Sequence, residues 1–153
     1  VADAVSIPVI AAGGIADGRG FAAARMLGAQ AVQVGTRFVV SRECVVHPRY
    51  KQQILRAKDI DSVVTGRSGG HPVRALRNKM SREYLRREQA GCEFEELESL
   101  TVGALRKAVV DGDVDYGTLM AGQIAGMIQE EKSCREIIEG MMDEAESLMN
   151  RAW

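Results

Sequence analysis

Two short apolar segments with a helix-like segment between them place the tightest constraint on how the N-terminal third of this chain folds. Residues 7–12 are wholly apolar and are followed by Gly13-Gly14, and residues 31–35 are almost wholly apolar and end in Gly35. Runs that are apolar on both faces are typical of buried parallel strands. Between them, Asp17 can cap a helix that closes at Gly28. Strand, helix and strand in about thirty residues predict a βαβ unit with a right-handed crossover.

The rest of the chain is predicted to be mostly helical. Ser133 and Glu136 have the spacing of a capping box at the start of the last helix. Helices are expected over residues 42–58, 100–109, 119–129 and 133–149, with an extended piece at 61–65 and a turn-rich break at 66–70. The predicted fold class is therefore α/β, with two βα units followed by a mostly helical C-terminal segment.

Composition excludes several functional classes. The chain has 153 residues and a formal net charge of −1, whereas a general nucleic-acid binder is usually basic. It has no apolar stretch of about 18 residues, so no membrane span is expected. Cys44, Cys92 and Cys134 lie far apart, as do the two histidines, so neither a disulfide framework nor a metal site is expected. Reduced cysteines and the lack of a signal-peptide pattern predict a cytoplasmic protein.

The two glycine-bearing strand ends are the candidate ligand-binding site. Glycine permits positive φ and lets an oxygen approach the main chain closely. In parallel α/β folds, ligands bind where strands finish and helices begin, because amides converge there. Gly13 and Gly14 follow the first strand, Thr36 adds a hydroxyl after the second, and Arg37 adds charge. The pattern predicts a phosphate site, and the alternative is that these glycines only end strands. The residues alone do not identify which phosphate-containing ligand binds.

Other candidate residues have a structural interpretation beside the functional one. His47 and His71 each precede a proline and are interpreted as loop-fixing residues or as residues lining an active site. The paired glycines Gly122 and Gly126 allow a close helix contact, while Gly122 with Gln123 could instead cover a bound phosphate. The methionine-rich stripe at 137–149 is interpreted as a packing face rather than a cofactor site.

Charge is segregated in the middle of the chain. Between residues 67 and 87, seven basic residues accompany one acid, and five glutamates follow between 88 and 98. This basic segment could dock an acidic carrier protein or a nucleotide phosphate by charge complementarity. Alternatively, it is a solvated face that pairs with the acidic segment after it.

The full pattern of motifs resembles the flavin-binding half of the nitronate monooxygenase superfamily, and within it the FMN-dependent enoyl-acyl-carrier-protein reductases of type II. The motifs are IPVIAAGGIADG at 7–18, LGAQAVQVGTRF at 27–38, HPRYK at 47–51, HPVRALRN at 71–78, and GDVD at 112–115 leading into MAGQIAG at 120–126. The resemblance runs over essentially the whole chain.

That resemblance implies a TIM (β/α)8 barrel that binds FMN, in which residues 1–65 are the last two βα units and residues 66–153 a mostly helical extension packed on the barrel. It places Gly13 and Gly14 on the FMN phosphate after strand seven, and the following residues on it after strand eight: Gln33, Val34, Gly35 and Thr36. The implied activity is reduction of the 2,3-double bond of enoyl thioesters on acyl carrier protein, with NADH or NADPH as co-substrate, in fatty-acid synthesis.

Two departures from the family pattern matter. The chain opens at what corresponds to strand seven, so the half that bears the usual catalytic histidine has no counterpart, and no catalytic residue is assigned. We therefore expect the 153-residue chain to be inactive and to bind FMN weakly or not at all. The second departure is the segment Gly69-Gly70-His71-Pro72, which differs from the reductase pattern and is more similar to that of the monooxygenase branch.

Two alternatives to the reductase stay open. The first is a flavin oxidase of the nitronate monooxygenase type. The second is a truncated and inactive fragment that self-associates. Exposed strand edges also predict a homo-oligomer.

Overall fold

The computed structural model describes residues 1–151, which divide into two compact units. Unit 1 contains residues 1–44 together with the segment from residue 130 onward, and unit 2 contains residues 45–129.

Unit 1 contains the predicted βαβ arrangement. After a short 3₁₀ turn, Ala2–Ala4, strand β1 (Ile10–Ala12) leads to helix α1 (Gly18–Met26) and strand β2 (Ala31–Gln33). The strands pair in parallel, which confirms the prediction. The Asp17 side chain caps α1, because Gly20 N donates to its Oδ1 at 3.1 Å. Helix α2 (Thr36–Val39) follows β2 directly.

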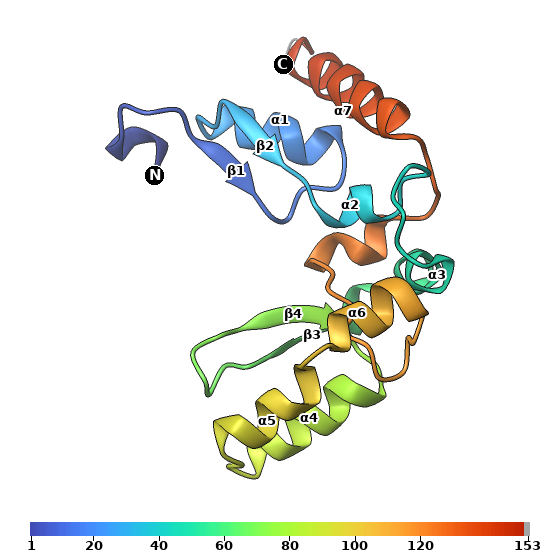
Figure 1. The fold of residues 1–153 in the computed structure, drawn as a ribbon. Helices are drawn as coiled ribbons and strands as arrows, with labels where there is room; N and C mark the ends of the chain where they lie inside the picture. The colour runs from blue at the N-terminus through green and yellow to red at the C-terminus, as the bar shows by residue number, and fades with distance from the viewer. Residues whose placement is uncertain (152–153) are drawn as a thin grey trace. The chain divides into compact units, whose positions relative to one another are not determined.

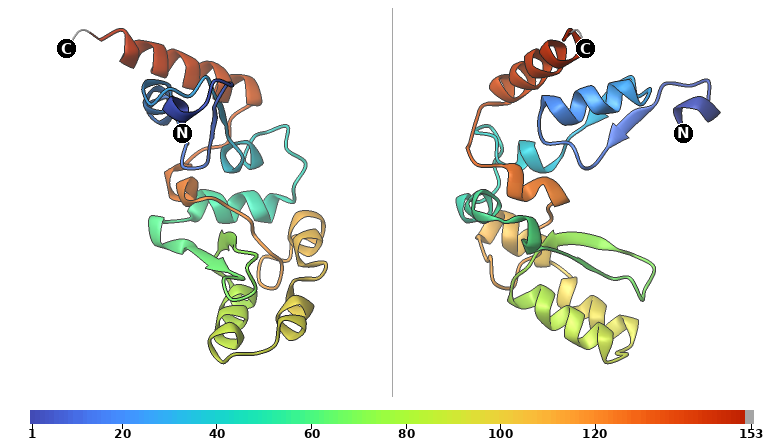
Figure 2. Two further views of the ribbon diagram at one scale, coloured as in Figure 1. Left: turned by 90° about the vertical axis from the view of Figure 1, so that its left-hand side faces the viewer. Right: turned by 180° about the vertical axis from the view of Figure 1, so that it is seen from behind.

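Helix α7 (Cys134–Met149) packs along α1 in unit 1, and Figures 1 and 2 show the two helices side by side in every view. The contact is close at Gly18, where a Cβ would lie 2.5 Å from Glu144 Cβ and 2.6 Å from the Met141 carbonyl oxygen. Ile137 and Met141 join Ile15 in the core of this unit. The packing face predicted for the methionine-rich stripe is therefore the buried side of α7.

Unit 2 is built around a β-hairpin and helices. Helix α3 (Pro48–Arg56) and the 3₁₀ turn Asp59–Asp61 precede the antiparallel strands β3 (Ser62–Thr65) and β4 (Val73–Leu76). Helices α4 (Lys79–Gln89) and α5 (Phe94–Thr101) lie beside the hairpin in Figure 1. The unit continues through α6 (Ala104–Arg106), a π-helical turn Lys107–Asp111 and a 3₁₀ turn Gln123–Met127.

The prediction of a helix over residues 119–129 is wrong, because residues 119–121 pair with the β-hairpin. Leu76 N donates to Leu119 O at 2.8 Å, and Ala121 N donates to Arg74 O at 3.3 Å. These bonds hold residues 119–121 extended along β4, with Ala75 opposite Met120. Because the backbone is already paired in this way, only the short 3₁₀ turn forms after it.

The helix expected over residues 42–58 is shorter than predicted, because it begins at Pro48. Proline at the first helical position fixes φ and needs no amide partner, and the residue before it is pushed to an extended conformation. His47 has ψ 136° and donates its backbone N–H to Val109 O at 2.8 Å. The extended piece at 61–65 is confirmed by β3, whereas β4 was not predicted.

The predicted division between residues 65 and 66 separates a barrel part from an extension. In the structure this position falls at the end of β3, inside the hairpin, and the compact units are divided elsewhere, with α7 in unit 1. The packing of residues 66–153 on a barrel stays a prediction.

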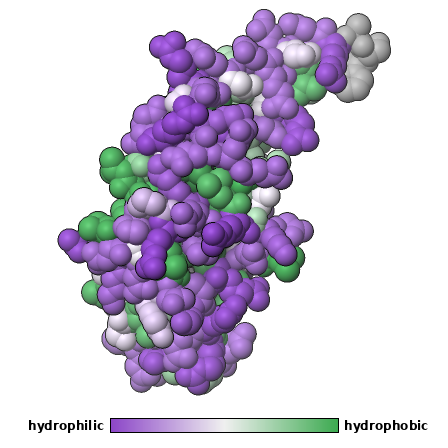
Figure 3. All heavy atoms as spheres, turned by 90° about the vertical axis from the view of Figure 1, so that its right-hand side faces the viewer, coloured by the Kyte–Doolittle hydropathy of each residue, from purple (hydrophilic) through white to green (hydrophobic). Residues whose placement is uncertain are grey.

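The surface is mainly hydrophilic where Figure 3 shows it, with hydrophobic residues in small groups. Within residues 1–151, no helix combines the length and the apolar character needed to cross a membrane.

Candidate functional site

The ends of β1 and β2 lie next to each other. The parallel register pairs Ile10 with Ala31 and Ala12 with Gln33. Gly13 and the residue after Gln33 therefore leave the sheet at the same end, on neighbouring strands. The structure thus brings together the two glycine-bearing segments that the sequence predicted to share a phosphate site.

The three glycines at these strand ends leave open space above the main chain. Gly13 and Gly14 have φ of +85° and +75°, a region that side chains other than glycine rarely adopt. A Cβ built on Gly13, Gly14 or Gly35 would meet no atom within 4 Å. Gly35 has φ −99° and so does not need to be glycine for its backbone conformation. All three residues are exposed, so a ligand oxygen can approach the backbone here.

The side chains of the segment after Ala31 alternate between two sides. Val32 and Val34 pack against the core of unit 1, whereas Gln33 is exposed. Val34 can therefore offer a ligand only its main chain, and Gln33 can offer its amide. Thr36 is half-buried at the start of α2.

Carboxylates already occupy the N-terminus of α1. Glu144 Oε2 accepts from Gly18 N at 2.8 Å, in addition to the Asp17 cap. Burial raises the pKa of Asp17, but the hydrogen bonds from Arg19 and the Gly20 amide outweigh it and leave that pKa below its usual value. An anion near these strand ends is thus left to the glycine segments rather than to the first turn of α1.

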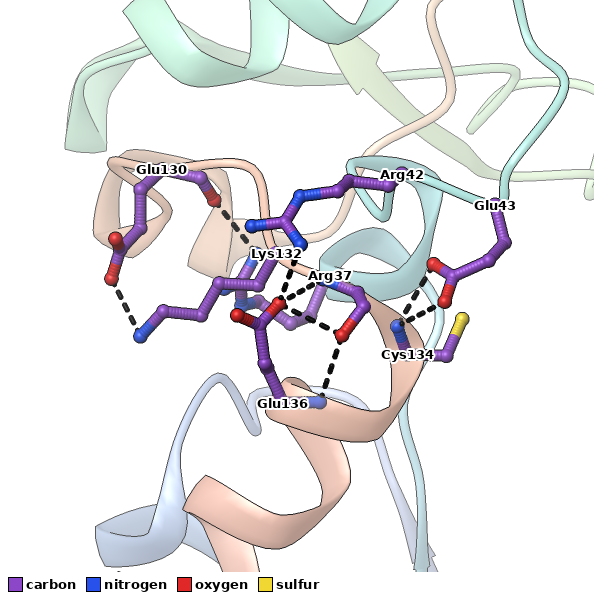
Figure 4. Close-up of polar contacts among 8 residues, drawn as sticks. Arg37, Arg42, Glu43, Glu130, Lys132, Cys134 and Glu136 are labelled. Carbon is purple, nitrogen blue, oxygen red and sulfur yellow. Dashed lines mark hydrogen bonds and ion pairs between the residues drawn. The ribbon is translucent and has the colours of Figure 1, made fainter.

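Arg37 does not supply the surface charge that its position suggested. Its side chain is 8% exposed, and its Nη1 donates to Glu130 O at 3.0 Å. Burial lowers the pKa of Arg37, with Glu130 acting in the opposite direction. Figure 4 shows this arginine inside a polar cluster at the start of α7. Its role there is to hold the residues before α7.

The same cluster caps α7. Glu43 accepts from Cys134 N through both carboxylate oxygens, at 3.0 and 2.9 Å, and this bond is the main cause that lowers the pKa of Glu43. Ser133 and Glu136 form the predicted capping box, which the structure confirms. Arg42 completes the cluster with an ion pair to Glu136 at 3.0 Å (Figure 4).

The two histidines have different surroundings within unit 2. His47 Nδ1 accepts from Arg49 N at 3.1 Å, so it caps α3, in agreement with a loop-fixing role. Gly112 lies against its ring, since a Cβ there would overlap the imidazole. His71 is exposed at the end of the hairpin, with its ring centroid 6.1 Å from that of Phe94.

Two arginines of the basic segment pair with a nearby acid, whereas Lys79 pairs with Asp115, which is distant in sequence. Glu83 binds both Arg86 and Arg87 at 2.7 Å, and these hydrogen bonds lower the pKa of Glu83 to about 2. The predicted pairing with the acidic segment is wrong for residues 1–151, where no glutamate from 88 to 98 forms an ion pair. Arg67 and Arg82 are exposed and make no ion pair with a described residue.

A cavity of about 550 Å³ lies inside unit 2. Its walls come from one side of the hairpin and from α4, α5 and α6. The lining residues are Thr65, Gly66, His71, Val73, Ala75, Met80, Ser81, Tyr84, Phe94, Glu98, Thr101, Leu105, Thr118 and Met120. The sequence reasoning missed this cavity because it missed β4. The alternation of Val73 and Ala75 after the glycine-rich turn was the available signal.

Gly122 and Gln123 lie at the start of the 3₁₀ turn in unit 2, and Gln123 is exposed. At Gly126, a Cβ would come within 2.8 Å of the backbone of Lys58 and Asp59. The predicted close contact therefore exists, but with a turn rather than with a helix. Whether Gly122 and Gln123 cover a phosphate stays a prediction. Residues 1–151 contain no cluster of three or more metal-ligating side chains.

Residues 1–144 match the sequence model of the nitronate monooxygenase family, and the chain belongs to that family. This confirms the predicted resemblance. The structure of FabK from Thermotoga maritima superimposes with a TM-score of 0.91 at 51% sequence identity, over 97% of this chain and 47% of FabK.

Two curated proteins also match. A probable nitronate monooxygenase of Bacillus subtilis is 37% identical over 94% of this chain and 41% of its own length. A (3aS,4S,5R,7aS)-5-hydroxy-7a-methyl-1-oxo-octahydro-1H-indene-4-carboxyl-CoA dehydrogenase of Mycobacterium tuberculosis is 31% identical over 95% of this chain and 52% of its own length. The chain thus spans about half the length of these relatives.

Proposed function

We propose that the glycine segments after β1 and β2 bind the phosphate of FMN, as the last two βα units of a TIM-barrel flavoenzyme. The observation that carries this proposal is the register that places Gly13-Gly14 and Gly35 at neighbouring strand ends with open space above each. Main-chain amides that converge on one point favour an anion. Gln33, Val34 and Thr36 complete the proposed contact.

The residues present fit a phosphate group. Side chains at Gly13, Gly14 or Gly35 would fill the space that the phosphate oxygens need, and none is there. The first turn of α1 is closed by Asp17 and Glu144, which confines the phosphate to the strand ends. When bound, FMN supplies the redox chemistry, while this chain contributes binding and orientation.

The activity proposed for the whole protein is reduction of the 2,3-double bond of an enoyl thioester carried on acyl carrier protein, with NADH or NADPH as reductant. The match to FabK, an enoyl-acyl-carrier-protein reductase of type II, supports this choice. The 153-residue chain alone is expected to be inactive and to bind FMN weakly, because it contains only two of the eight strands of the proposed barrel.

A nitronate monooxygenase is the second candidate, supported by the family match and by the relative from Bacillus subtilis. Two chimeras compare the activities, because the half that bears the usual catalytic histidine comes from the host enzyme. This chain replaces the corresponding half of Thermotoga maritima FabK in one chimera and of the Bacillus subtilis protein in the other. Under anaerobic conditions, flavin reduction by NADH or NADPH in the FabK chimera, without flavin reduction by an alkyl nitronate in the other, supports the reductase. The reverse result supports the monooxygenase.

Phosphate recognition itself can be tested on the 153-residue chain. We expect millimolar FMN to shift the NMR amide signals of Gly13, Gly14, Gly35 and Thr36, whereas riboflavin, which lacks the phosphate, leaves them unchanged. Equal shifts with both ligands would contradict the proposal. Tight binding with a full flavin spectrum would contradict the expected weakness of the chain on its own.

The proposed partner is an acidic carrier protein, docked on the side of α4 that bears Arg82. Arg82 is exposed and makes no ion pair with a described residue, unlike Arg86, which is held by Glu83. In the FabK chimera, Arg82→Glu should raise the Michaelis constant for a carrier-linked substrate and leave that for a short thioester unchanged. Equal constants for the carrier-linked substrate in parent and variant would refute docking at this position.

A further inference from the structure

The cavity in unit 2 has the size and the wall chemistry of a small-molecule site. Its volume of about 550 Å³ lies within the usual range of about 300–1,000 Å³ for ligand pockets. Val73 and Ala75 of β4 form part of one wall, and Met80 and Tyr84 of α4 form part of another. All of its lining residues belong to unit 2, so the cavity does not depend on the glycine segments of unit 1.

Two hydroxyl groups on the wall are already bonded within the protein. Ser81 is buried, and its hydroxyl accepts from Asn78 N at 2.9 Å and donates to Asn78 O at 3.2 Å. Thr101 Oγ1 donates to Glu98 O at 2.9 Å. No buried side-chain nitrogen or oxygen of the described residues lacks a partner. The fully buried polar atoms therefore do not call for hydrogen bonds from a ligand.

The charges around the cavity favour a neutral ligand. The lining contains no lysine or arginine, and Glu98 is its one carboxylate and is exposed. A ligand with its own carboxylate in the cavity would face that glutamate without a compensating cation. An uncharged alkyl chain avoids this repulsion. Its burial is favourable in proportion to its apolar area.

The rim is formed where the hairpin turn meets α5. Phe94 is 42% exposed and faces the ring of His71, and a Cβ on Gly69 would come within 2.9 Å of Phe94. The turn between β3 and β4 thus closes against this phenyl ring. Met120, which is exposed, forms another part of the lining.

We propose that this cavity holds the acyl chain of a neutral thioester substrate. The identification of the chain as part of a substrate rests on the proposed function, whereas the apolar binding site rests on unit 2 alone. The role of unit 2 in this proposal is to bind the tail of the substrate and to exclude water from it.

The experiment measures binding of S-hexanoyl, S-octanoyl and S-decanoyl N-acetylcysteamine to the 153-residue chain by calorimetry, with NMR to map the site. Each added methylene should tighten binding about two- to fourfold. Octanoic acid at pH 7 should bind more weakly than the octanoyl thioester, because of its charge. FMN binding is measured on the same samples.

Neighbouring residues at the end of α5 provide a matched pair of variants. Thr101→Phe places a ring in the cavity and should weaken octanoyl thioester binding about tenfold or more. Val102 is 69% exposed and does not line the cavity, so Val102→Phe should change binding by less than about twofold. If Thr101→Phe does not fold by circular dichroism, Leu105→Trp is compared with Arg106→Trp in the same way.

Dependence on chain length that is lost in the filled variant and kept in its control supports the proposal. Two results overturn it: no dependence on chain length, or equal binding in both variants of a pair. If FMN binds and the thioesters do not, this inference fails while the proposed function stands. If the thioesters bind and phosphate-dependent FMN binding is absent, the proposed function fails while the apolar site stands.

Discussion

Alanine substitutions at the strand-end glycines should separate the effect of backbone conformation from the effect of ligand binding. At Gly13 and Gly14 the positive φ costs a non-glycine residue about 1–2 kcal/mol. The lower entropy of the unfolded chain returns about 0.4–1 kcal/mol of this. No steric clash adds to the cost, because the space above both residues is open. Each variant should therefore lose roughly 1 kcal/mol of unfolding free energy.

Gly35→Ala should behave differently, because Gly35 has φ −99° and ψ −69°, close to the right-handed helical region. The entropy term alone predicts that this variant is more stable by about 0.4–1 kcal/mol. Its new methyl nevertheless stands where the phosphate is proposed to lie. Loss of one hydrogen bond to a charged group costs about 1.5–3 kcal/mol, which is roughly a tenfold to 150-fold loss of FMN affinity.

Gly140→Ala is the matched control. Gly140 lies inside α7, is exposed, and has open space around its Cβ position, so alanine should stabilise the helix by about 1 kcal/mol without affecting FMN. The assays are urea unfolding followed through amide signals of unit 1, and FMN titration followed by NMR. Gly35→Ala with unchanged FMN affinity would refute the phosphate site, and Gly13→Ala with unchanged stability would refute the left-handed conformation.

Two further substitutions test the packing and the electrostatics of the units. Gly18→Ala should destabilise unit 1 by about 1–3 kcal/mol, because its Cβ would meet α7 at 2.5 Å. Gly20→Ala, whose nearest contact is 3.3 Å, should be tolerated. Equal losses of stability in urea unfolding would contradict the close contact of α1 with α7. Glu83 has a folded pKa of about 2 against an ordinary 4.5, so its ion pairs stabilise the protein above pH 4.5 and are lost as the pH falls toward 2. Glu83→Gln should make unfolding stability less dependent on pH in that range, and parallel pH profiles would contradict this.

The βαβ unit could be predicted because each of its signals is local. Asp17 marks the start of α1, the apolar runs mark the strands, and the spacing between them allows the parallel pairing of Ala12 with Gln33. The capping box of Ser133 and Glu136 is local in the same sense. In each case the residues that decide the structure lie in one short continuous segment of the chain.

Other parts of the chain were harder to predict, because distant residues decide their local structure. Leu119 and Ala121 are extended only because β4 pairs with them from more than forty residues earlier in the chain. Arg37 was expected to serve the ligand, yet the carbonyl of Glu130, far away in sequence, accepts its hydrogen bond. No periodicity in a short window contains such partners, so the sequence pattern indicated a helix in one case and a surface cation in the other.

The two faces of the β1–β2 pair give a further argument about the whole protein. Both strands were predicted to be buried on both faces, yet only Ala11, Val32 and Val34 pack against the core, while Ile10 is 61% exposed together with Ala12 and Ala31. Within the described residues each strand also has one partner. An apolar face beside two unpaired edges favours further strand pairing. In the proposed barrel, the other strands cover this face. In the predicted homo-oligomer, a second copy of the chain covers it instead, and a dimeric or larger mass of the 153-residue chain in solution would support that alternative.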